Sequence, residues 1–370
     1  MLKIIGIWIL KYLLIVMPIL ISVAYLTLFE RKVLGYCQIR KGPNVVGLYG
    51  TLQPLADGVK LFTKETIVPS HANLGLFLAC PIFALSLGMM PWFFFINKGN
   101  NTGGFNSLMN HPYSLLILLV FMGFGIFTIA FSGWSSNSKY AFLGSVRAVA
   151  QMISYEVSMY LILMSVIGVS MSCNLYQIFK TQALTYSNIF AMWPLALMFL
   201  VTLLAETNRA PFDLSEGESE LVSGYNVEYS AMPFALFFLA EYSHIIASSW
   251  LWVVLFFGGH DGQSIYFTIP LRAALLVFFF VWVRATLPRF RYDLLMSLMW
   301  KQYLPLSIGL LFLNMGLTTL FTQTFSLELF QGCELGEIFR KKFSIYFPPL
   351  TPRNKHTLLL LIREVAEWLR

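Results

Sequence analysis

The chain has 370 residues, of which 57% are hydrophobic and only 12% are charged, and its formal net charge is +7. An average soluble domain contains about 25% charged residues, so this composition excludes an ordinary soluble domain and indicates an integral membrane protein. The basic residues are spread along the loops. This distribution fits the positive-inside rule and argues against a nucleic-acid partner.

Several apolar runs reach the length of roughly 20 residues that crosses a bilayer. They predict an all-α integral membrane protein with about eight transmembrane helices in residues 1–330. In chain order the runs are Ile4–Leu28, Leu74–Ile96, Ser114–Phe131, Ala148–Met171, Ile189–Ala205, Met232–Phe257, Leu271–Val283 with its flanks, and Leu304–Phe321. The loops after the first, third, fifth and seventh runs hold most of the Lys and Arg residues, which predicts that they face the matrix or the cytoplasm.

The first long loop contains a predicted amphipathic surface helix, from Gln53 to Lys64. Pro54 suits the first turn of a helix, and apolar residues recur at helical spacing after it. We expect this helix to lie along the membrane plane or under a partner protein. Beyond it, residues 331–370 form a C-terminal extension, for which two interpretations stay open: a partly disordered tail, or a linker and an amphipathic helix.

The most acidic segment runs from Glu206 to Tyr229, between two of the predicted membrane helices. Its carboxylates are Glu206, Asp213, Glu216, Glu218, Glu220 and Glu228. Charge is costly near lipid, so the segment predicts proton or ion handling, or a docking surface for another protein. The three glutamates at 216–220 cannot all ionise freely in a confined site and would share protons there; in the open they would form a solvated acidic loop. For Glu206, an ion pair with Arg209 at i+3 is the alternative to a functional role.

Two further carboxylates, Glu156 and Glu241, lie inside predicted membrane helices. At membrane depth a carboxylate costs about 2.5–3.5 kcal/mol on insertion scales, so each should face the bundle or a water-filled cavity. Proton transfer is the functional interpretation, and a structural hydrogen bond or ion pair is the alternative. His244, one turn after Glu241, could join such a relay.

No other pattern of ligands or nucleophiles is apparent. The 4 cysteines (Cys37, Cys80, Cys173 and Cys333) and the 5 histidines are widely scattered, which argues against a zinc site, an iron–sulfur cluster or a disulfide framework. We therefore expect no metal site and no redox centre in the chain. Arginines beside aromatic residues near the sequence WVRATLPRFRYDLL, at 282–295, suit anionic lipid, the acidic groups or a polar passage.

Several long segments resemble subunit 1 of respiratory complex I, the NADH–ubiquinone oxidoreductase chain 1 family, which has bacterial as well as mitochondrial members. They are Glu30–Gly47, Leu52–Glu65, Ser132–Val157, Glu206–Ser230, Phe234–Tyr242 and Arg284–Lys301, and they follow one another in family order. The resemblance extends to about Leu320. The extension after Phe330 and His244 depart from the family pattern, so no role is carried over to them.

The resemblance implies a core membrane subunit of proton-pumping complex I in the mitochondrial inner membrane, or in a bacterial plasma membrane. Its substrate would be ubiquinone, while NADH, FMN and the iron–sulfur clusters would reside in other subunits. Its partners would be the peripheral quinone-site subunits, neighbouring membrane-arm subunits and membrane lipids. The implied acidic, proton-linked funnel comprises Glu156, Glu206, Glu216, Glu218, Glu220, Glu228 and Glu241. The implied quinone cavity and tunnel comprise Arg31, Arg40, Asp57, Lys60, Arg209, Asp213, Phe234, Arg284, Arg289 and Arg291.

Two other functions stay open at this point. One is the membrane subunit of a related membrane-bound hydrogenase-type complex, which the close match of the loop segments disfavours. The other is a purely structural anchor for a soluble redox arm. An anchor needs the loops but has no use for Glu156 or Glu241, so these two residues separate the hypotheses.

Overall fold

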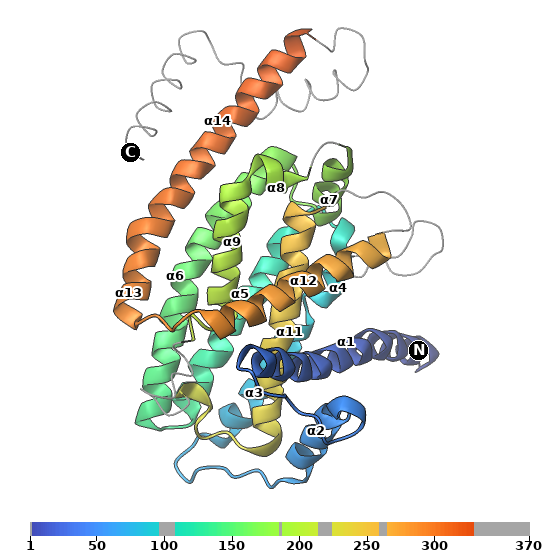
Figure 1. The fold of residues 1–370 in the computed structure, drawn as a ribbon, viewed down its shortest axis with the longest axis vertical. Helices are drawn as coiled ribbons and strands as arrows, with labels where there is room; N and C mark the ends of the chain where they lie inside the picture. The colour runs from blue at the N-terminus through green and yellow to red at the C-terminus, as the bar shows by residue number, and fades with distance from the viewer. Residues whose placement is uncertain (1, 96–107, 185–186, 214–223, 259–264, 329–370) are drawn as a thin grey trace.

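A computed structural model describes residues 2–95, 108–184, 187–213, 224–258 and 265–328. These residues form helices and connecting loops, with no β-strand among them (Figure 1). The helices are α1 (Leu2–Cys37), α2 (Gln53–Thr63), α3 (Leu74–Met89), α4 (Trp92–Phe95), α5 (Ser114–Ser135), α6 (Lys139–Ser170), α7 (Leu175–Leu184), α8 (Asn188–Ala191), α9 (Trp193–Glu206), α11 (Ala231–Phe256), α12 (Ile265–Thr286), α13 (Tyr292–Leu298) and α14 (Leu304–Glu328).

The all-α membrane fold is confirmed by the length and composition of these helices. Within the described ranges, 6 helical stretches are long and apolar enough to cross a membrane. They are Leu74–Phe95, Ser114–Ser135, Lys139–Ser170, Ala231–Phe256, Thr268–Thr286 and Tyr292–Leu320. The other two predicted spans fall on α1 and on the shorter apolar helix α9. Each of the predicted apolar runs therefore corresponds to a helix.

α11 occupies the middle of the bundle. It packs against α3, α9, α12 and α1, while α6 packs against α5, α9 and α14. In Figure 1, α1 and α12 run across the direction of α11 instead of along it. Small residues permit some of these contacts: a Cβ added to Gly88 on α3 would lie 2.6 Å from the Ser243 hydroxyl of α11. Such close approach is typical of helix packing in membranes.

The amphipathic helix predicted in the first long loop is present as α2, from Gln53 to Thr63, with Pro54 in its first turn. It contacts α1 and α11. Its apolar residues remain on the surface of the chain, since Leu55, Val59 and Phe62 are 63%, 62% and 71% exposed. This helix therefore presents an apolar face that the described part of the chain does not cover.

Two predicted features lie outside the described residues. They are the central part of the acidic segment, with Glu216, Glu218 and Glu220, and the C-terminal extension 331–370. Predictions for them stay predictions.

Candidate functional site

A buried carboxylate on α1, Glu30, joins three separate parts of the chain. Its Oε1 forms ion pairs with Arg284 of α12 and with Arg209, at 3.4 Å, in the loop after α9. The Tyr242 hydroxyl of α11 donates a hydrogen bond to its Oε2 at 2.5 Å. A buried charge is tolerated only when it is paired and hydrogen-bonded. These four side chains, called here the Glu30 cluster, meet that condition.

Arg209 connects the Glu30 cluster to Glu241. Its Nη2 lies 4.0 Å from Glu241 Oε2, and its guanidinium lies 4.3 Å from the centre of the Tyr242 ring. Glu241 also accepts a hydrogen bond of 2.6 Å from the Tyr225 hydroxyl. One guanidinium is thus shared between two carboxylates, with an aromatic face beneath it that favours the cation.

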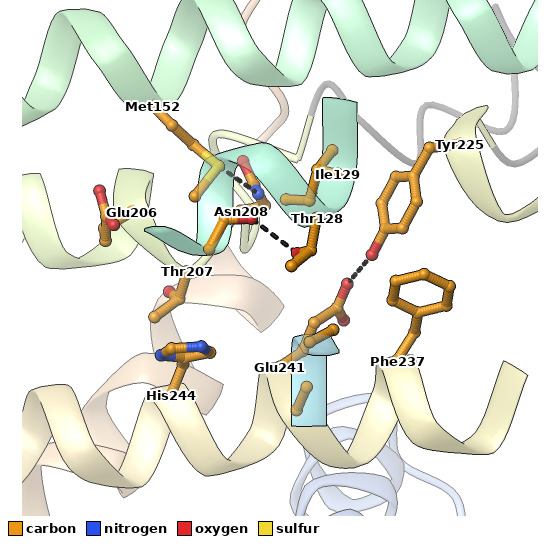
Figure 2. A pocket seen from close by; sticks show the side chains of 13 residues that line it. Thr128, Ile129, Met152, Glu206, Thr207, Asn208, Tyr225, Phe237, Glu241 and His244 are labelled. Carbon is orange, nitrogen blue, oxygen red and sulfur yellow. Dashed lines mark hydrogen bonds between the residues drawn. The ribbon is translucent and has the colours of Figure 1, made fainter. Parts of the chain in front are cut away.

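A cavity lies on the other side of Glu241, among α3, α5, α6, α9 and α11 (Figure 2). Its volume is about 50 Å³. Its walls combine apolar side chains with a small number of polar and ionisable ones. The residues are Ala84, Gly125, Thr128, Ile129, Met152, Glu206, Thr207, Asn208, Tyr225, Phe237, Ala240, Glu241 and His244. Two of the predicted proton-linked carboxylates, Glu206 and Glu241, therefore open onto one space.

Glu206 lines this cavity and also lies near a third carboxylate, Glu156. Its side chain is buried, and within the described residues its Oε2 has no hydrogen-bond partner. It is close enough to Glu156 of α6 for the two charges to interact. Glu156 in turn lies near the Tyr160 hydroxyl and against Gly123 of α5, where an added Cβ would meet Glu156 Oε1 at 2.8 Å.

The polar residues of α6 lie on two different faces of the helix. Glu156 shares its face with Tyr160. Gln151 lies on the neighbouring face and donates hydrogen bonds to the carbonyls of Ala205 and Phe212, at 3.1 and 2.8 Å. The reason is the helical rotation of about 100° per residue, which separates Glu156 from the stripe of Gln151, Tyr155 and Ser158. Gln151 instead holds the loop that carries Arg209.

Asp213 lies at the end of the same loop. It is buried and forms an ion pair with Arg289 at 3.4 Å. Beside this pair the rings of Phe212 and Phe290 stack with centroids 5.7 Å apart. Glu241 is within electrostatic range of Asp213. Four of the described carboxylates thus form a series of neighbours: Asp213, Glu241, Glu206 and Glu156.

The other predicted site residues lie away from this series. Arg31 and Asp57 form an exposed ion pair at 2.7 Å, and Arg291 pairs with Asp293 at 3.5 Å on the surface. Arg40 binds Gln38 and Lys60 is exposed on α2. Phe234 packs on a small cluster that contains Phe77 and Tyr229. Glu228 is partly buried and is not among the residues that line the cavity within the described part of the chain.

Sequence reasoning missed Glu30, which forms ion pairs with two arginines in the site. The available signal was its position, two residues after the predicted span ends and beside Arg31. An ion pair of Arg209 with Glu206 was the local expectation, whereas the partner that Arg209 binds, Glu30, lies 179 positions away along the chain. Local spacing cannot reveal such a partner.

Comparison with known proteins gives the family. A model of the NADH dehydrogenase family matches residues 10–315. The chain is 52% identical to NADH-ubiquinone oxidoreductase chain 1 of Metridium senile over 307 residues, which cover 81% of this chain and 90% of that protein. The chain belongs to the NADH–ubiquinone oxidoreductase chain 1 family.

Other family members are similarly close. The chain is 51% identical to NADH-ubiquinone oxidoreductase chain 1 of Paracentrotus lividus, over 82% of this chain and 93% of that protein. It is 50% identical to that of Sminthopsis macroura, over 81% and 93%. As a member of the NADH–ubiquinone oxidoreductase chain 1 family, it is a multi-pass subunit of complex I in the mitochondrial inner membrane, and its partners are other complex I subunits.

Proposed function

We propose that this subunit forms the membrane part of the ubiquinone-binding cavity and links quinone reduction to proton translocation through its buried carboxylates. The observation that carries the proposal is the continuous series from Asp213 through Glu241 and Glu206 to Glu156. A structural anchor has no need of such a series at membrane depth, where each carboxylate is costly.

The quinone end of the series is proposed to lie at Asp213 and Arg289. Their ion pair joins the loop after α9 to the loop before α13. A ubiquinone that gains electrons must also gain protons, so its reduction changes the charge balance nearby. Asp213 and Glu241 interact electrostatically, which gives that change a route to the inner carboxylates. The peripheral quinone-site subunits are the proposed partners at this end.

In this proposal the protonation state of Glu241 determines the position of Arg209. Because it is shared by Glu30 at 3.4 Å and Glu241 at 4.0 Å, protonation of Glu241 weakens one attraction and leaves the other. Arg209 then moves toward Glu30, and Glu241 loses its attraction to the side of the Glu30 cluster while it still faces the cavity. The cavity connects Glu241 to Glu206, and Glu206 passes the change to Glu156. Neighbouring membrane-arm subunits are the proposed receivers.

The experiment is to assemble complex I carrying Glu241→Gln or Glu206→Gln and to reconstitute it in liposomes. Glutamine keeps the size of the side chain and removes the exchangeable proton. We expect ubiquinone-dependent NADH oxidation and proton uptake to fall by tenfold or more, consistent with the usual loss of about 10²–10⁴ when a proton-transferring group is removed. Normal turnover with normal pumping in both variants would exclude the proposal.

A further inference from the structure

One ionisable group in the cavity has no part in the series of carboxylates. His244 follows Glu241 by one turn on α11, and residues three apart on a helix lie on the same face. Both side chains line the cavity. In Figure 2 the imidazole ring lies beside Thr207, with the Glu206 side chain beyond it. An imidazole therefore lines the same space as two carboxylates.

We propose that His244 carries protons across this cavity between Glu241 and Glu206, an inference that rests on the proposed function. Imidazole has two ring nitrogens, so one can accept a proton while the other releases one. A proton leaves the Glu241 carboxyl for one ring nitrogen, and the proton on the other nitrogen passes to the Glu206 carboxylate. Glu241 ends ionised, Glu206 ends protonated, and the ring ends neutral as it began.

The cavity has the polarity and the size that this transfer needs. A water molecule needs roughly 10–15 Å³ of cavity volume and two to four polar partners, and the volume of this cavity is about 50 Å³. Thr128, Thr207 and Asn208 supply polar groups on its walls. The Oε2 of Glu206 is buried without a hydrogen-bond partner in the described part of the chain, so this oxygen is available to accept the proton.

The groups that set the charge around His244 come from every side of the cavity. Glu206 faces it from α9, Glu241 from α11 and Tyr225 from the turn Gly224–Asn226. Arg209 acts on it through Glu241, and Glu156 of α6 through Glu206. The lining residues of α3 and α5 in the described structure are Ala84, Gly125, Thr128 and Ile129, none of which ionises.

The test compares His244→Ala and His244→Asn in intact complex I in liposomes. Asparagine keeps the hydrogen bonding and part of the volume of histidine but cannot carry a proton. Alanine leaves space that dissolved imidazole can fill. We expect both variants to lower ubiquinone-dependent NADH oxidation by about tenfold or more. Added imidazole should restore part of the rate in His244→Ala in proportion to its concentration, and should restore nothing in His244→Asn. NADH oxidation by a soluble artificial acceptor should stay normal, and His71→Ala serves as an exposed control.

Two results would overturn the proposal. One is a normal rate and a normal proton yield in His244→Ala. The other is full activity in His244→Asn, because packing and hydrogen bonding would then explain the residue. The Glu241→Gln and Glu206→Gln complexes separate the two levels of inference. If the two glutamate variants are defective and the His244 variants are normal, the carboxylates link quinone reduction to proton translocation without His244. If all four variants are normal, both proposals fail.

Discussion

Glu30 and Arg284 are 254 positions apart in the sequence and form an ion pair between α1 and α12. The carboxylate is 7% exposed and the guanidinium 31%. The pair lies where α1 and α12 both pack against α11. It therefore joins the first apolar helix to one near the end of the described chain.

Glu30→Gln is expected to destabilise the subunit. Removing one partner of a buried pair costs about 3–5 kcal/mol because the other charge stays buried, and the partial exposure of Arg284 reduces this to about 2–3 kcal/mol. A native gel should show less assembled complex, with a lower inactivation temperature. Asp57→Asn breaks the exposed pair with Arg31 and should cost under about 1 kcal/mol. Equal losses in both variants would contradict the importance assigned to burial.

Gly123→Ala is expected to disturb the Glu156 site. An added Cβ would meet Glu156 Oε1 at 2.8 Å, so the carboxylate must move. We expect a severalfold lower ubiquinone-dependent rate. Gly58→Ala, on the surface helix α2, is the control because nothing lies within 4 Å of its added Cβ; it should be neutral or gain about 0.5–1 kcal/mol of helix stability. A Gly123→Ala complex with normal activity would show that this contact is unimportant.

Tyr225→Phe removes the hydroxyl that donates to Glu241 at 2.6 Å. A hydrogen bond to a charged group contributes about 1.5–3 kcal/mol, so the ionised form of Glu241 loses that support. We expect a clear fall in ubiquinone-dependent NADH oxidation, with assembly retained. Tyr229→Phe is the control, since its hydroxyl lies 3.2 Å from Ser135 and outside the cavity lining. If the two variants behave alike, the hydroxyl on Glu241 has no special role.

Gln151→Leu tests the loop that carries Arg209. The substitution keeps the volume but leaves the buried Phe212 carbonyl without this donor, whereas the Ala205 carbonyl still accepts from the Asn208 backbone amide. An unsatisfied buried group costs about 1–3 kcal/mol, so the inactivation temperature of the complex should fall by several degrees. Ser248→Ala, which loses only a bond to the Ile245 carbonyl of its own helix, should change little.

Local patterns in the sequence predicted most of the helices and several site residues. Apolar runs marked the helices that cross the bundle, and the cost of intramembrane charge singled out Glu156 and Glu241. The shared face of Glu241 and His244 followed from their spacing of three residues. The predicted helices were confirmed because they depend on neighbours within one turn of helix, whereas the roles of Glu156 and Glu241 stay predictions.

The rest of the site depends on contacts between distant segments. Glu30 binds Arg209 from 179 positions away, and neither residue carries a local sign of that partner. Which side of α6 meets Gly123 depends on how α5 packs, which the apolar pattern leaves open because a membrane helix is apolar on all sides. The pairing of Asp213 with Arg289 likewise arises only when two loops meet.

The position of α11 has a mechanical consequence. Three residues within one turn, Glu241, Tyr242 and His244, border two separate hollows, because Tyr242 lines the space with Glu30 and Arg284 while the other two line the larger cavity. One turn of α11 therefore presents side chains to two different spaces. Any twist or slide of α11 must change the shape of both hollows together, so the ion pairs on one side and the ionisable groups on the other cannot be adjusted independently.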